Sequence, residues 1–148
     1  MRLAAICSVL ALTATACAAP LPPASEPAPP STAIRDSLKG AYDMIQNNIT
    51  RAAEQVPENL YSYRATPEVR TLGQLFAHIA DASFSICSAV SGESRPEGSI
   101  EETRTTKADV QQALDEAAEF CGRAFEAVDD ASGADAGTLF GALPTTKL

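Results

Sequence analysis

The alternation of apolar and polar residues predicts helices, and it is most informative in residues 71–90, TLGQLFAHIADASFSICSAV. Apolar or small residues recur there at alternating spacings of three and four, the period of one helix face. They are Leu72, Phe76, Ile79, Ser83, Ile86 and Val90, with Leu75 and Cys87 beside them. Thr71 and Gln74 stand at the spacing of a capping box, which predicts the start of the helix. We expect this helix to be the second of a bundle.

His78 is the only histidine of the chain and lies one position off the centre of that stripe. This position is suited to a groove between helices, where bundles build metal sites from converging side chains. The alternative is a histidine bonded to a neighbouring carbonyl or carboxylate. A lone histidine favours the alternative.

Two further helices are predicted. The first spans residues 33–54 and ends before Pro57, with an inner line of Ile34, Leu38, Ala41, Ile45, Asn48 and Ala52. The other begins at a second capping box, Thr106 to Asp109, and has the most regular stripe: Val110, Leu114, Ala117, Cys121, Ala124 and Val128. We expect the three stripes to converge on one core.

The connecting segments differ in character. Residues 57–70 contain large side chains (Leu60, Tyr61 and Tyr63) that we expect to fold over one end of the bundle. Residues 91–105 form a polar loop long enough to cross it. After Asp130 the helical pattern ends, and only Leu139, Phe140 and Leu143 are candidates for docking. No fourth helix is predicted.

The beginning of the chain predicts export. Residues 1–19 combine Arg2, an apolar run and the small residues before Cys17, which is typical of a secretory signal. Cys17 resembles the lipid-attachment cysteine of bacterial lipoproteins, and lipid anchoring and plain secretion remain alternatives. Residues 20–32 are proline-rich and predict an extended tether, so that residues 33–148 form the folded domain. The expected location is the periplasm or cell envelope of a bacterium.

The net charge of −8 limits the partners. An acidic protein repels nucleic acid and anionic lipid, and we therefore exclude both. Membrane association is expected only through an anchor at Cys17.

Of the four cysteines, Cys87 and Cys121 remain in the predicted domain. An even number in an exported chain indicates a disulfide, and the alternative is two buried free thiols. Cys87 lies 16 residues after Thr71, and Cys121 lies 15 after Thr106. At about 1.5 Å per residue these heights are nearly equal. A disulfide between them therefore favours parallel second and third helices.

Several segments resemble the DinB-like family, specifically its exported members. They are AAEQVPENLYSYRATPEVRTLGQLFAHIADASFSIC (residues 52–87), SIEETRTTK (residues 99–107), Cys121, and Leu139-Phe140-Gly141. The resemblance extends over residues 31–143. Arg64 stands where the family often has proline.

The resemblance implies an all-α, up-down-down-up four-helix bundle that holds zinc or nickel with three histidines. His78 matches the histidine of the second helix. The other two belong to an H-x-x-x-H pair on the fourth helix, and this sequence has no counterpart to them. A zinc site usually needs at least three protein ligands. Either the chain is truncated and lacks most or all of its last helix, or it is a member that has lost the site.

Two functions follow from this reading. The first is a non-catalytic envelope protein of unknown substrate. The alternative is a metal-dependent hydrolase or thiol S-transferase that uses His78 as one of three ligands. No other catalytic motif is evident, and Glu101 and Glu102 are interpreted as an exposed loop pair. Without a fourth helix, an apolar strip should stay open, so a homodimer is an expected partner state.

Overall fold

The computed structural model describes residues 28–148. The predicted signal at 1–19, the cysteine at position 17 and most of the predicted tether lie outside these residues. The elements in chain order are α1 (Ala33–Gln55), η1 (Glu58–Leu60), α2 (Leu72–Ser91), α3 (Ile100–Thr103), α4 (Lys107–Glu126), α5 (Asp130–Gly133), β1 (Ala136–Leu139) and β2 (Leu143–Thr146).

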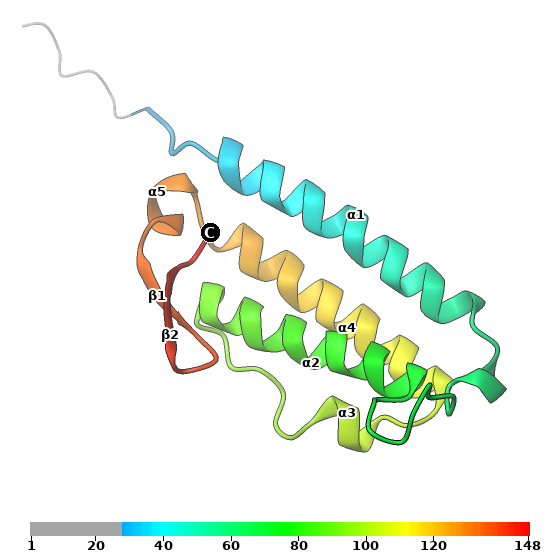
Figure 1. Cartoon of the computed structure of the whole chain (residues 1–148). Coiled ribbons are helices and arrows are strands. Elements are labelled where there is room, and N and C mark those ends of the chain that lie inside the picture. The colour runs from blue at the N-terminus through cyan, green and yellow to red at the C-terminus, as the bar shows by residue number, and fades with distance from the viewer. Residues whose placement is uncertain (1–27) are drawn as a thin grey trace, which may run out of the picture.

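The three long helices form a bundle in which α2 and α4 run in the same direction and α1 runs in the opposite one (Figure 1). This confirms the predicted all-α bundle and the parallel second and third long helices. The described residues contain no fourth long helix. After the single turn of α5, the chain forms an antiparallel hairpin in which β1 pairs with β2 from Ala136↔Thr146 to Leu139↔Leu143. The hairpin was not predicted.

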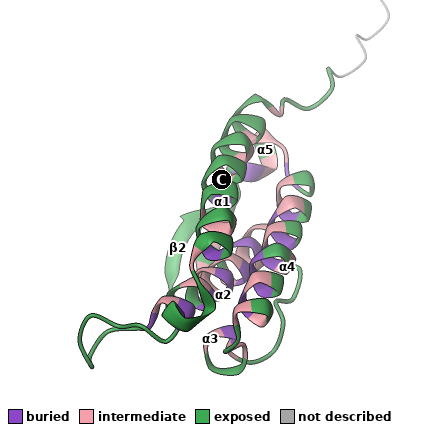
Figure 2. Ribbon diagram, turned by 90° about the vertical axis from the view of Figure 1, so that its right-hand side faces the viewer, coloured by how far each residue is buried: buried purple, intermediate pink, exposed green. Residues whose placement is uncertain are grey.

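The core is centred on α4, as its regular stripe predicts. All six residues of that stripe are at most 5% exposed: Val110, Leu114, Ala117, Cys121, Ala124 and Val128. Thr106 is confirmed as the N-cap, because its Oγ1 accepts the Asp109 N–H. The helix packs against both α1 and α2, and its buried residues lie on the side turned toward them (Figure 2).

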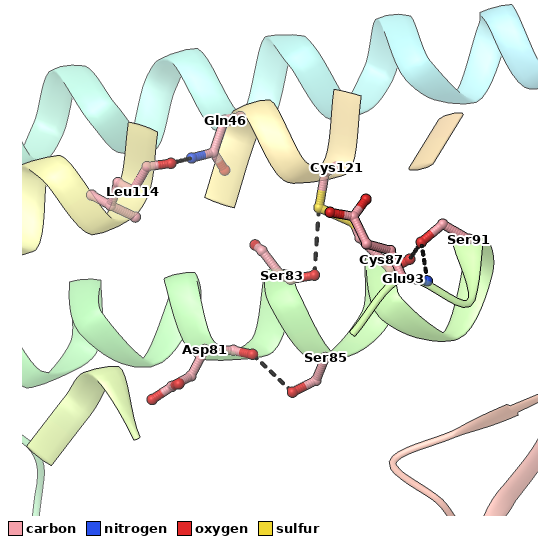
Figure 3. Close-up of a disulfide and its surroundings, with 9 residues drawn as sticks. All are labelled: Gln46, Asp81, Ser83, Ser85, Cys87, Ser91, Glu93, Leu114 and Cys121. Carbon is pink, nitrogen blue, oxygen red and sulfur yellow. Dashed lines mark hydrogen bonds between the residues drawn. A yellow bond between two sulfur atoms is a disulfide. The ribbon is translucent and has the colours of Figure 1, made fainter. Parts of the chain in front are cut away.

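The inner line predicted for α1 is wrong. Its large residues point to solvent, with exposed fractions of 59% for Ile34, 42% for Leu38 and 55% for Ile45. The residues that α1 buries are Gln46 and Ala53. Gln46 is accommodated because its Nε2 donates to the carbonyl of Leu114 at 3.2 Å (Figure 3). A buried amide with a partner carries little penalty, so a polar residue can face the core.

The buried face of α2 lies next to the stripe that the sequence predicted for it. The buried residues of α2 are Gly73, Ala77, Ala80, Phe84 and Cys87. Most of the predicted stripe lies on the neighbouring flank and is only partly buried, and Ile86 is 42% exposed. The capping box at the start of α2 is confirmed, since Thr71 and Gln74 bond reciprocally.

The displaced stripes of α1 and α2 border a groove. A hollow of about 270 Å³ separates Leu38 and Tyr42 of α1 from Ser83, Ile86 and Val90 of α2, and Lys147 and Leu148 also line it. We call the five residues of α1 and α2 the α1–α2 groove. Burial raises the pKa of Tyr42 more than the nearby Ser83 hydroxyl lowers it, and the Tyr42 hydroxyl has no hydrogen-bond partner within the described part of the chain.

Tyr61 closes one end of the bundle, as predicted for the segment that contains it. It is 5% exposed, and its hydroxyl donates to the carbonyl of Ala53 in the last turn of α1 at 2.7 Å. The chain approaches closely here, because a Cβ on Gly73 would lie 3.1 Å from the Tyr61 ring. The other two side chains do not cover the bundle: Leu60 and Tyr63 are 42% and 57% exposed.

At the opposite end of the bundle, Asp130 connects α5 to the start of α1. Its carboxylate accepts the backbone N–H groups of Ile34 and Arg35 and the hydroxyl of Ser31, and so caps α1 from α5. Of the predicted docking residues, Phe140 and Leu143 are exposed, so that part of the prediction is wrong. Leu148 docks instead, packing its side chain against Gly133 and donating its N–H to the Gly133 carbonyl at 3.0 Å.

Cys87 and Cys121 form a disulfide between α2 and α4, with a Cα–Cα distance of 5.2 Å. The predicted pairing is therefore found, and it lies beside the Ser83 carbonyl (Figure 3). Among residues 28–148, no helix combines the length and apolar character that membrane crossing requires.

Candidate functional site

His78 projects from α2 toward the short helix α3. Its side chain is 47% exposed, and its Nδ1 lies 3.2 Å from Oε2 of Glu101. The other oxygen of Glu101 accepts the Nε–H of Arg70 at 2.8 Å. The three side chains form a row, Arg70–Glu101–His78, in which the carboxylate is shared by a permanent cation and an imidazole.

Asp81 determines where Glu101 lies. It follows His78 by one turn of α2, and its carboxylate accepts the N–H of Ile100 at 3.0 Å and that of Glu101 at 2.9 Å. The hydroxyl of Ser99 donates to the same carboxylate at 3.2 Å. A four-residue helix has little stability of its own, so this cap fixes α3 on α2 and brings Glu101 to His78.

The interpretation of Glu101 and Glu102 as an exposed pair is therefore only half correct. Glu102 is exposed, whereas the Glu101 side chain is 19% exposed and carries two partners. The sequence did carry a signal for α3, because Ser99 and Glu102 have the spacing of a helix start. Ser99 indeed accepts the N–H of Glu102. The role of Asp81 was missed, since nothing local marks an aspartate that caps a distant segment.

The described residues do not fit the three-ligand metal site that the family resemblance implies. His78 and Glu101 supply two ligand-type side chains. Residues 28–148 contain no group of three His, Cys, Asp or Glu side chains placed to hold a metal ion. The two remaining cysteines are engaged in the disulfide. A zinc centre of the usual kind needs at least one more protein ligand beside His78 and Glu101.

A polar cleft of about 880 Å³ lies next to this row, at the end of the bundle where α2 and α4 begin. Four cationic side chains line it, Arg64, Arg70, Arg104 and Lys107, together with three glutamates that include Glu101. His78 is not part of its lining. The cleft therefore shares Arg70 and Glu101 with the row.

The charged groups of the cleft mostly serve the fold. Lys107 donates to the carbonyls of Glu54 and Val56 at 2.7 and 2.8 Å, which satisfies the C-terminal end of α1. Arg70 is bound to Glu101, and Arg104 lies 3.6 Å from Glu116. Two of the four cationic side chains are thus paired with carboxylates, and Lys107 is bound to backbone carbonyls.

The comparison with protein families agrees with this fold. The sequence model of the DinB superfamily matches residues 41–148. The chain belongs to the DinB superfamily. No curated protein and no solved structure matched the chain. The match covers α1 from Ala41 onward, all of α2 and α4, and the hairpin, so this DinB-superfamily chain carries His78 and Glu101 within the matched region.

Proposed function

We propose that this DinB-superfamily protein is a non-catalytic domain of the bacterial cell envelope that acts through binding. The observation that carries the proposal is the row Arg70–Glu101–His78. Its imidazole is placed against a carboxylate that also binds an arginine, and the described residues bring no third ligand to it. This arrangement stabilises α3 on α2 and does not assemble a reaction centre.

The family-type alternative, a metal-dependent hydrolase or thiol S-transferase, requires more than this row provides. Such an enzyme uses a metal as Lewis acid or to activate water or a thiol, and a catalytic zinc keeps three protein ligands. Since His78 and Glu101 supply two, we derive no catalytic step for this chain.

Export is part of the proposal. It is supported by the signal predicted at residues 1–19 and by the proline-rich tether predicted at 20–32. The disulfide between Cys87 and Cys121 also suits an oxidising compartment. Lipid attachment at Cys17 would hold the domain at a membrane surface, whereas its acidic character disfavours nucleic acid and anionic lipid as partners.

The non-catalytic role is tested by metal analysis of the full protein, purified without chelators and then incubated with zinc or nickel. We expect well under one bound ion per protomer, and no change in His78→Ala. A stoichiometric ion that is lost in His78→Ala would contradict the proposal and support the enzyme alternative.

Export and anchoring need a separate test, because they do not depend on His78. Fractionation of cells should place the protein in the envelope. Replacement of the cysteine at position 17 by serine should release it from the membrane fraction if that residue carries lipid. Recovery of the wild-type protein in the cytoplasm would refute export.

A further inference from the structure

The exposed side of α1 carries an apolar stripe whose period is that of a coiled-coil seam. Its residues follow one another at spacings of four, three, four, three and four: Ile34, Leu38, Ala41, Ile45, Asn48 and Ala52. We call these six residues the α1 stripe. All six are exposed, and three of them are large apolar residues that are more than 40% accessible. Contiguous apolar surface of this kind marks an interaction site in a soluble domain.

The α1 stripe is uncharged, although the chain as a whole has a net charge of −8. The six residues of the α1 stripe and the five residues of the α1–α2 groove are uncharged. Lys147 also lines the hollow, and its ammonium group is paired with the Asp135 carboxylate at 3.3 Å. The charged side chains of α1 lie on other faces, where Lys39 pairs with Asp43. Two copies can therefore meet along the α1 stripe without bringing like charges together, although each copy is acidic.

We propose that the partner of this surface is a second copy of the chain, whose α1 stripe packs against the α1 stripe and the α1–α2 groove of the first. A seam of alternating three and four spacings fits a helix with the same period, and α1 is itself such a helix. In a twofold dimer the same patch serves both copies. The inference is independent of whether His78 binds a metal.

The area is sufficient for a stable dimer. A 23-residue helix such as α1 is about 35 Å long and about 10 Å wide, which gives its stripe roughly 350 Å². The facing flank of α2, with 20 residues, adds roughly 300 Å². Two copies would bury roughly 1,300 Å² in total, which lies within the range of specific interfaces, about 1,200–2,000 Å².

The experiment compares the full protein with Ile45→Glu and with the matched control Asn47→Glu by sedimentation over a wide range of concentration. Ile45 is 55% exposed, so a charge there should leave the fold intact. Asn47 is also exposed but lies outside the α1 stripe. We expect the wild type and Asn47→Glu to be dimers. Ile45→Glu should raise the dissociation constant by at least about a hundredfold, because it buries an unpaired charge in each copy.

A second variant, Ile34→Glu, should behave as Ile45→Glu does, with circular dichroism to show that both remain folded. Binding of a hydrophobic dye gives an independent readout, since the dissociated variants should bind more dye than the dimer. A monomeric wild type would overturn the proposal, and if it were also silent to the dye, a segment of its own chain would fill the groove. An Ile45→Glu dimer as tight as the wild type would equally refute it.

Discussion

Asp81 accepts a hydrogen bond from the backbone N–H of Glu101, 20 residues later in the chain, and thereby places the Glu101 carboxylate beside His78. His78 is the only histidine of the chain, and the carboxylate beside it is positioned by the cap of a four-residue helix. A side chain that looks like a metal ligand in the sequence is, in the folded domain, one end of a row that joins α2 to α3.

Asp81→Ala should lower the free energy of unfolding by about 1–2 kcal/mol, because it removes the cap of α3 and the loss of an N-cap has about that effect. It should also increase the exchange of the Ile100 and Glu101 amides, which lose their acceptor. Denaturant unfolding and amide exchange measure the two effects. The control is His78→Ala, which removes a half-exposed contact and should change stability by less than about 1 kcal/mol. Equal effects of the two substitutions would contradict this account.

Loss of the disulfide between Cys87 and Cys121 should lower stability by roughly 3–4 kcal/mol, since the bond closes a loop of 34 residues in the unfolded chain. Urea unfolding of the reduced protein and of the double serine variant should give the same decrease. Mass mapping without reductant checks the bond itself. Free thiols at both positions in the exported protein would show that the bond does not form there.

Acid should weaken the attachment of α1 to α5. The Arg35 N–H above all, and then the Ser31 hydroxyl, hold the pKa of Asp130 below its ordinary value of 3.8. A carboxyl whose pKa is lower in the folded state contributes stability above the unfolded value, and that contribution is lost as the pH falls through the folded value.

Asp130→Asn should therefore be less stable than the wild type near neutral pH, and the difference should vanish as the pH drops below 3.8. Thermal melts of both proteins across this range provide the measurement. A difference that stayed constant down to the lowest pH would mean that the charge of Asp130 contributes nothing.

Tyr61→Phe should destabilise the domain by about 1–2 kcal/mol, because the Ala53 carbonyl loses a buried hydrogen bond. Tyr63→Phe is the matched control, since that ring is 57% exposed and should tolerate the change. The measurement is the denaturant midpoint of each variant, compared with that of the wild type. If both variants were as stable as the wild type, Tyr61 would close the bundle through its ring alone.

The sequence predicted the start and the buried face of α4 correctly and the inward faces of α1 and α2 incorrectly, for one physical reason. Both other long helices cover α4, so its single apolar stripe had to be its buried side. On α1 the apolar stripe contains Ile34 and Ile45, yet the buried positions are Gln46 and Ala53. Periodicity identifies the apolar face of a helix, but the presence of neighbours decides whether that face is covered.

Other features depended on contacts that no local pattern records. The capping box of α2 was predicted because both of its members lie within one turn. The bonds from Asp81 to α3 and from Asp130 to α1 join segments that are far apart in the chain. The hairpin was missed because its strands show no apolar alternation, although Gly141 marks its turn with φ of 69°.

The capping of α1 by Asp130 has a consequence for the orientation of the whole domain. The chain enters α1 at Ser31, whose hydroxyl bonds the same carboxylate, so the entering segment is fastened to the α5 end (Figure 1). The polar cleft lies at the other end, about 35 Å away along the 23 residues of α1. An anchor attached through the residues before Ser31, as proposed for position 17, would therefore hold the domain at its α5 end and leave the cleft lined by Arg64 at the end farthest from the attachment.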